Sequence, residues 1–205
     1  PLLLNGRVTT LRLSVVSAVA ATGMGLIAAA ARTSRVPVVS QLSLLYTEVF
    51  RGSPLLITLL FVYFGASGFG VDLNLFVAAV VGLSIYEGAY IGEIFRSGIE
   101  AVPPGQLEVS RVLGFGPVGT FAHVVMPQTR RVALPPLVGQ YIALVKDSSI
   151  AFMIGLPELM KQGQSIVDRI GQPVVVYPFV AALYFAVCYP ASLWVRNLEK
   201  RNQFA

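Results

Sequence analysis

The sequence is poor in charge and in the residues that build most enzyme sites. Only 12% of its 205 residues are Asp, Glu, Lys or Arg, against about a quarter in an average soluble domain. It has one cysteine, so no disulfide can form within the chain, and one histidine. So few charges could not cover the surface of a water-soluble protein. The composition therefore indicates an integral membrane protein.

Several chemical motifs are also missing from the sequence. It contains no G-x-x-x-x-G-K-[ST] stretch, which would cradle the phosphates of ATP, and no C-x-x-C, H-E-x-x-H or G-x-S-x-G. The single histidine, His123, falls in a predicted cytoplasmic loop, where a solvated or interface position is expected. We therefore expect no catalytic residue, no metal site and no cofactor bound by this chain.

Apolar residues make up 55% of the chain, and its mean hydropathy is +0.73. A helix needs roughly 20 mainly apolar residues to cross a bilayer, and five stretches approach that length. They are residues 11–31, 52–71, 73–97, 132–157 and 173–195. The sequence thus predicts an all-α polytopic membrane protein with about five transmembrane helices in a single domain, 1–205. Pro173, Pro178 and Pro190 suggest kinks or ends in the last helix.

The net charge of +5 is scattered between the apolar stretches, which is more typical of an orientation signal than of nucleic-acid binding. One predicted side holds Arg7, Arg12, Lys161 and Arg169. The other side holds Arg32, Arg35, Arg51, Arg96, Arg111, Arg130, Arg131, Arg196, Lys200 and Arg201. Because basic residues favour the cytoplasm, we expect the N-terminus outside and the C-terminus inside. No nucleic-acid partner is expected.

A half-polar segment, LEVSRVLGFGPVGTFAHVVMP (107–127), lies between the third and fourth stretches. Its start has a helical pattern, because Val109, Val112 and Leu113 recur at i, i+3 and i+4 on one face. Glu108 and Arg111 lie three residues apart on another face. The orientation above places this short amphipathic helix at the cytoplasmic surface.

Prolines and glycines set the limits of that helix. Pro103 and Pro104 end the preceding span, since paired prolines cannot continue a helix interior. Gly114 suits a helix C-terminus, where a left-handed backbone conformation is needed. The letters from Gly114 to Gly119 fit G-x-G-x-x-G, but these glycines follow a helix instead of a strand, so a dinucleotide site is not expected.

The same segment resembles the EAA motif of ABC-importer permeases, E-A-A, three residues, G, nine residues, I-x-L-P. Here the motif is represented by Glu108-Val109-Ser110, Gly114 and Val124-x-Met126-Pro127, with the spacing kept throughout. Three more stretches resemble the polar amino-acid branch of these permeases. They are YTEVFRGSPLLITLLFVYFG (46–65), AYIGEIFRSGIEAVPPGQLE (89–108) and LVKDSSIAFMIGLPEL (144–159). The resemblance covers nearly the whole chain.

This resemblance implies a type I ABC-importer permease fold in a bacterial cytoplasmic membrane. It also implies that loop 103–127 is a coupling helix that docks on a cytoplasmic ATPase, which would bind ATP and Mg²⁺. The residues assigned to this docking are Glu108, Val109, Ser110, Arg111, Val112, Leu113, Gly114 and Pro127. The expected partners are two ATPase copies, a second permease copy or a homologous permease, an extracytoplasmic amino-acid-binding protein and the lipid bilayer.

Charges inside predicted spans mark a candidate substrate pathway, because such charges are costly in a bilayer. Helical rise places Glu87, Lys146 and Asp147 at depths that could border one cavity near the midplane. Glu87 is expected to hold a substrate ammonium. Lys146 and Asp147 could instead form a structural ion pair. Thr58 and Ser148 are further pathway candidates, although a threonine bonded to its own helix is equally plausible for Thr58.

A different class of transporter would use the same charges. In an ion-coupled secondary amino-acid transporter, Glu87 and Asp147 would relay protons, and the chain would work without ATP. A membrane anchor or signalling subunit would leave the intramembrane charges unexplained. The expectation from the sequence is the permease subunit of an ATP-driven importer for a polar amino acid, an opine or a related solute.

Overall fold

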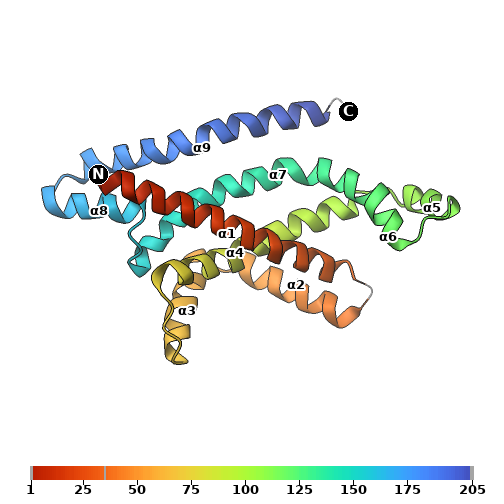
Figure 1. Ribbon diagram of the computed structural model, residues 1–205, viewed down its shortest axis with the longest axis horizontal. Coiled ribbons are helices and arrows are strands. Elements are labelled where there is room, and N and C mark those ends of the chain that lie inside the picture. Colours follow the sequence, from red (N-terminus) through yellow and green to blue (C-terminus); the bar gives the residue numbers. More distant parts are fainter. Residues whose placement is uncertain (1, 35, 204–205) are drawn as a thin grey trace.

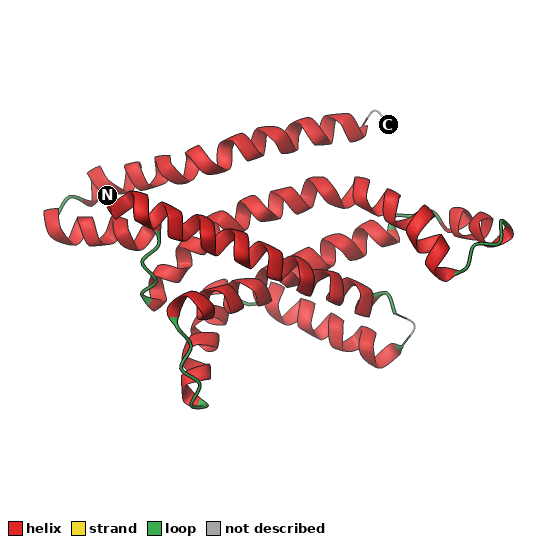
Figure 2. Ribbon diagram, in the orientation of Figure 1, coloured by secondary structure: helices red, strands yellow, loops and turns green. Residues whose placement is uncertain are grey.

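A computed structural model describes residues 2–34 and 36–203, with side chains up to residue 195, and these residues form only helices and loops (Figures 1 and 2). The long helices are α1 (Leu2–Arg32), α4 (Leu75–Glu100), α7 (Met126–Asp147) and α9 (Pro173–Gln203). The shorter elements are α2 (Pro37–Gly52), α3 (Leu55–Gly68), α5 (Pro104–Val112), α6 (Pro117–Thr120), the π-helix η1 (Phe121–Val125), the 3₁₀-helix η2 (Ser148–Ile154) and α8 (Leu159–Ile170). The all-α prediction is confirmed for the part of the chain described.

Within the described residues, four helical segments are long and apolar enough to cross a membrane, and the bent pair α2–α3 could supply a fifth span. Figure 1 shows the long helices running along one axis, with α5 and α6 at one end and α8 near the N-terminus at the other. Of the basic residues used to predict orientation, Arg35 and the side chains of Arg196, Lys200 and Arg201 lie outside the described part.

The second predicted span, 52–71, contains the single helix α3, which has only 14 residues. It reaches the length of a span only together with α2, which the sequence did not predict as part of it, and the two helices meet at an angle of 109° across Ser53 and Pro54. Proline has no backbone N–H and disfavours a helical residue before it, and Ser53 is extended, with φ −101° and ψ 151°. Hydropathy did not predict α2 as part of a span, because this helix contains the charged residues Glu48 and Arg51 and several hydroxyl residues.

Two other predicted boundaries also differ from the structure. The fourth span is helical from 117 to 154, so it begins well before the predicted start at residue 132. The first turns of this segment contain polar and charged residues, and hydropathy therefore did not include them. Helix α9 begins at Pro173, in agreement with the prediction that this proline marks the end of a helical segment. The helix does not end at Pro178 or Pro190 but continues through both. A proline inside a membrane helix is tolerated because neighbouring groups can satisfy the freed carbonyl.

Helices α1 and α4 approach closely through small residues. A Cβ atom on Gly25 would lie 2.6 Å from Ile91 Cγ2 and 2.9 Å from the backbone nitrogen of Gly92. A Cβ on Gly88 would lie 3.0 Å from Met24 Cβ on α1. Small residues allow membrane helices to pack backbone against backbone. Gly88 and Gly92, which are four residues apart on α4, therefore serve packing inside this chain.

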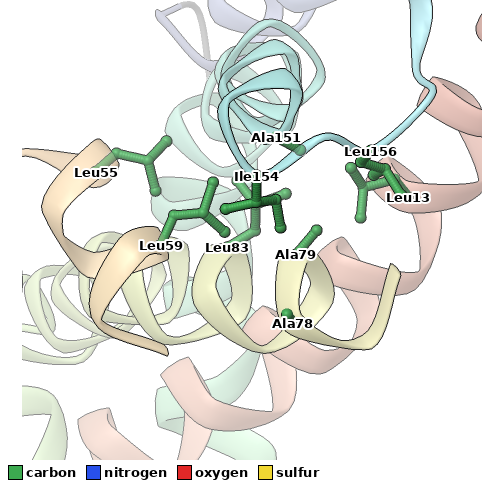
Figure 3. Packing of buried hydrophobic residues seen from close by; sticks show 9 residues of the cluster. All are labelled: Leu13, Leu55, Leu59, Ala78, Ala79, Leu83, Ala151, Ile154 and Leu156. Carbon is green, nitrogen blue, oxygen red and sulfur yellow. The ribbon is translucent and has the colours of Figure 1, made fainter. Parts of the chain in front are cut away.

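A cluster of buried apolar side chains lies where α1, α3, the start of α4 and the segment around η2 meet (Figure 3). Its members are Leu13, Leu55, Leu59, Ala78, Ala79, Leu83, Ala151, Ile154 and Leu156. This cluster holds η2 and the turn after it against α4. The carboxyl groups described below therefore sit on a packed framework.

Candidate functional site

The loop between α4 and α7 folds as a hairpin of short helices. Pro103 is the N-cap of α5 and Pro104 occupies its first turn, where a missing N–H costs nothing. The helix ends at Val112, and Gly114 follows the C-cap Leu113 with a φ of +81°, the predicted left-handed conformation. Beyond it, the amide of Phe115 donates to the carbonyl oxygen of Ser110 at 3.0 Å, which closes the turn.

The buried Ser110 joins the two halves of this hairpin. Its hydroxyl donates to the carbonyl oxygen of Leu107 at 2.8 Å and shares a second hydrogen bond with Thr120 Oγ1 at 3.0 Å. The π-helix follows, and His123 lies exposed on it with Nδ1 3.0 Å from the carbonyl oxygen of Gly119. The hairpin is therefore a preformed structure held by its own hydrogen bonds.

The outer surface of the hairpin is apolar. Val112 is 87% exposed, Leu113 is 70% exposed and Val118 is 81% exposed, and Val109 is exposed beside them. We call these four residues the apolar tip. Glu108 and Arg111 are exposed on the same short helix. Exposed apolar residues grouped at the end of a molecule, with charges at the margin, are typical of a protein-docking surface.

Not every residue of the predicted docking set lies on this surface. Ser110 points inward, as described, and Pro127 lies exposed in the first turn of α7, beyond the hairpin. Spacing in the sequence alone could not separate surface residues from those that support them, because both belong to the same motif.

Glu87 lies on α4 and is completely buried (0% exposed). Gln140 of α7 donates from Nε2 to Glu87 Oε2 at 2.7 Å. The other oxygen, Oε1, is buried and meets no hydrogen-bond donor among the residues that the structure describes. Asp147, also from α7, lies near enough for its carboxyl group to act electrostatically on that of Glu87.

Lys146 is not the counterion of this carboxyl pair. Consecutive helical residues do not share a face, and Lys146 lines a cavity of about 330 Å³ between α7, α8 and α9, beside Tyr177 and Tyr184. In the described part of the chain, no carboxylate lies within 4.0 Å of its amino group. The structure thus places Asp147 near Glu87 and Lys146 in a separate cavity, and the Lys146–Asp147 ion pair, which was one of the two alternatives, is not formed.

The two hydroxyl residues predicted to line the pathway, Ser148 and Thr58, are both buried. Ser148 is fully buried, and its hydroxyl donates to the carbonyl oxygen of Val145 at 2.8 Å, within its own helical turn. Thr58 is buried on α3, one turn beyond the bend. Ser148 is thus occupied locally in this conformation.

A second fully buried carboxyl group, Glu158, was not expected from the sequence. It caps α8 by accepting from the amides of Met160 at 2.8 Å and Lys161 at 2.7 Å. Its Oε2 also accepts from the Tyr184 hydroxyl at 2.9 Å and the Thr10 hydroxyl at 3.4 Å. Burial raises the pKa of Glu158, and these hydrogen bonds act in the opposite direction. The sequence signal for this capping role was the position of Glu158 immediately before the amphipathic helix α8.

The chain is similar to known proteins over almost its full length. Residues 21–203 match the model of the family described as binding-protein-dependent transport system inner membrane component. The probable glutamine ABC transporter permease protein GlnP of Bacillus subtilis is 38% identical over 201 residues, covering 97% of this chain and 92% of that protein. The L-cystine transport system permease protein TcyB of Bacillus subtilis is 35% identical over 202 residues, covering 98% of this chain and 86% of that protein.

Solved structures give the same picture. The structure described as an amino acid ABC transporter with histidines superposes with a TM-score of 0.91 at 34% identity, covering 98% of this chain and 94% of that one. An inward-facing structure of the MetNI methionine ABC transporter superposes with a TM-score of 0.80 at 21% identity, covering 98% of this chain and 96% of that one, and it supports the fold alone.

Proposed function

The chain belongs to the family of inner membrane components of binding-protein-dependent transport systems, and from this membership we propose that it forms half of a pathway for a polar amino acid. As a member of the family, it is a multi-pass transmembrane permease subunit of an ABC importer. We treat residues 1–205 as one permease domain. The substrate class is supported by the relatives, which are named for glutamine and cystine.

The apolar tip carries the proposal that a separate ATPase drives transport. It presents Val112 and Leu113 at one end of the molecule, on a short helix that follows α4 after only residues 101–103. An amphipathic helix of this kind suits an apolar groove on a partner protein. Two ATPase copies would each hold one such hairpin, with Glu108 and Arg111 making polar contacts at the margin. ATP and Mg²⁺ would bind to those ATPases.

A substrate amine is the proposed partner of Glu87. Its buried Oε1 meets no donor in the described part of the chain, and the neighbouring Asp147 adds a second carboxyl group. Such an arrangement favours a cation, either the α-ammonium group or a cationic side chain. The amino group of Lys146, in the cavity between α7, α8 and α9, is available to a substrate carboxylate. Thr58 and Ser148 would border the path between these groups.

Alternating access would follow from movement of the hairpin. We place the N-terminus outside and the C-terminus in the cytoplasm of a bacterial cell, so that the hairpin faces the ATPases and α8 faces an extracytoplasmic amino-acid-binding protein. A second permease copy, or a homologous permease, would complete the pathway. ATP-driven closure of the ATPases would move both hairpins, tilt the attached spans and expose the carboxyl pair alternately to the two sides.

Reconstitution tests the function directly. The chain, its co-encoded ATPase and its binding protein are placed in proteoliposomes, and uptake of a panel of labelled amino acids is measured with and without ATP. We expect uptake only when all three proteins and ATP are present. Uptake by the chain alone, driven by a proton gradient and indifferent to ATP, would overturn the proposal in favour of a secondary transporter.

Variants of the apolar tip test the docking surface within the same assay. Val112→Asp places a charge in the proposed groove and should abolish co-purification of the ATPase. Val174→Asp is a matched control, because Val174 is 85% exposed at the start of α9, away from the hairpin. Retained ATPase binding by Val112→Asp would exclude the tip as the docking surface.

A further inference from the structure

A continuous row of charged and aromatic side chains joins the bend between α2 and α3 to the cytoplasmic end of α4. At the bend, the carbonyl oxygen of Arg51 accepts a hydrogen bond from the Tyr90 hydroxyl at 3.3 Å. The Arg51 guanidinium lies 5.5 Å from the centroid of the Tyr90 ring and 4.0 Å from a carboxylate oxygen of Glu93. The end of α2 is thus fastened to α4 by one residue in three ways.

The row continues along α4 toward the hairpin formed by α5 and α6, which we call the coupling hairpin. Arg96 donates from Nε to Glu93 Oε2 at 2.8 Å and forms a second bond to the other oxygen of that carboxylate. Arg96 also pairs with Glu100, the last residue of α4. Only residues 101–103 separate Glu100 from α5. We call Arg51, Tyr90, Glu93, Arg96 and Glu100 the α4 row.

The row lies on a different face of α4 from the one that packs against α1. The row's positions on α4 are 90, 93, 96 and 100, and spacings of three or four residues keep them on one side of the helix. The packing against α1 uses Gly88 and Gly92. Side chains of the row are 22–57% exposed within the single chain. They can therefore move without breaking the core.

The geometry around Glu93 is unequal. Its carboxylate is bound closely by Arg96, whereas Arg51 is held at the longer distance of 4.0 Å. One carboxylate between two arginines can change its main partner with a small displacement, which makes a two-state contact. Coupling between distant sites needs such an element, because each state must be favoured by a different ligand or partner.

We propose that Arg51 is a positioning residue that couples the bend between α2 and α3 to the movement of the coupling hairpin. The inference rests on the proposed function, since it assumes that an ATPase moves α5. Movement of α5 displaces the end of α4, Glu93 shifts from Arg96 toward Arg51, and α3 changes its angle at Pro54. The bend responds because the helix is already interrupted at Ser53 and Pro54, so a change of angle there breaks no backbone hydrogen bond within a continuous helix.

The test uses the complete transporter in proteoliposomes and measures substrate molecules moved per ATP hydrolysed. We expect Arg51→Gln to lower this ratio by about fivefold or more, the lower range of allosteric couplings, while ATP hydrolysis continues. Glu93→Gln should lower it similarly, and the double variant should be no worse than either single one. Arg12→Gln, an exposed arginine on α1 outside the row, should keep the wild-type ratio.

A distance measurement separates coupling from simple loss of structure. Spin labels at Phe61 on α3 and Ser97 on α4, both exposed, should report a change in separation when ATP is added to the wild-type transporter. That change should be lost in Arg51→Gln. If Arg51→Gln fails to assemble, Tyr90→Phe, which removes only one hydroxyl, decides the matter and should also lower the ratio.

A wild-type ratio and a preserved distance change in Arg51→Gln would overturn the inference, as would an unchanged ratio in Tyr90→Phe when the arginine variant does not assemble. These results are distinct from failure of the proposed function, in which the wild-type transporter itself would show no ATP-driven uptake.

Discussion

Glu87 and Glu158 are both completely buried carboxyl groups, yet their surroundings differ in the number of donors. Glu158 accepts hydrogen bonds from two backbone amides and from the hydroxyls of Tyr184 and Thr10. Glu87 accepts one hydrogen bond, from Gln140, and has another carboxyl group beside it. Burial is therefore the same at the two positions, whereas hydrogen-bond satisfaction is not.

The difference supports a structural role for Glu158 and agrees with the transport role proposed for Glu87. A buried polar group stabilises a fold only when its hydrogen-bonding capacity is met. Glu158 meets this condition and ties α1, α8 and α9 together. Glu87 leaves Oε1 without a donor among the described residues, which is a cost that a passing cation could relieve. We therefore expect substitution of Glu158 to lower mainly the stability of the protein, and substitution of Glu87 to lower mainly the rate of transport.

The largest expected effect is on stability, at Glu158. Glu158→Ala leaves two amides and two hydroxyls without their acceptor, and each buried unsatisfied group costs about 1–3 kcal/mol. We expect a loss of roughly 3 kcal/mol or more in the free energy of unfolding, read from the thermal midpoint in detergent. Glu87→Gln should keep or raise the midpoint, because an amide can still accept from Gln140 and can donate to Asp147. Equal losses in the two variants would remove the distinction.

The second effect concerns transport through Glu87. Glu87→Gln keeps the size of the side chain but removes its charge, so uptake of a cationic or ammonium-bearing substrate should fall at least about tenfold, equivalent to roughly 1.4 kcal/mol. The measurement is initial uptake rate against substrate concentration in proteoliposomes. Glu48→Gln, an exposed glutamate on α2, is the control. Unchanged uptake and unchanged substrate preference in Glu87→Gln would contradict the assignment.

A smaller effect is expected from one donor of Glu158. Tyr184→Phe removes a single hydroxyl and leaves three donors, so it should lower the free energy of unfolding by about 1 kcal/mol. Tyr189→Phe, at a partly exposed tyrosine on the same helix, provides the comparison. A loss at Tyr184 no greater than the loss at Tyr189 would show that the bond to Glu158 contributes nothing.

The smallest effect is a pH dependence of stability. Burial raises the pKa of Glu158 above its ordinary value of 4.5, although its hydrogen bonds limit this rise. Between 4.5 and the raised pKa, the folded protein holds a proton that the unfolded chain has released. The contribution to stability is therefore full below pH 4.5 and is lost as pH rises through the raised pKa. Thermal midpoints of wild type and Glu158→Gln across this range should converge as pH increases. Parallel curves would contradict the assignment.

Local features of the chain were predicted well because they depend on nearby residues. Low charge and long apolar stretches predicted an all-α membrane protein. The helix within residues 107–113 and the left-handed Gly114 were also predicted, because capping and amphipathic spacing act over a few residues. The bend at Pro54 had a sequence signal, a proline after Gly52-Ser53, but hydropathy averaging concealed it.

The partners of buried side chains could not be read in the same way. Lys146 and Asp147 are adjacent in the sequence, yet Asp147 lies near Glu87 whereas Lys146 lines a cavity between α7, α8 and α9. Thr10 and Glu158 are far apart in the sequence but hydrogen-bonded in the structure. Such contacts depend on how α1, α4, α7 and α9 pack, and no local pattern encodes that packing.

The sequence by itself thus determined the membrane class, the long apolar helices and the short amphipathic helix before Gly114, because hydrophobic length, capping and periodicity are properties of neighbouring residues. Only the tertiary structure decided that Glu158 has its hydrogen-bond donors and Glu87 does not, and that a row of charges leads from the bend between α2 and α3 to the end of α4. The physical reason is that desolvation and hydrogen bonding depend on which groups surround a side chain in space.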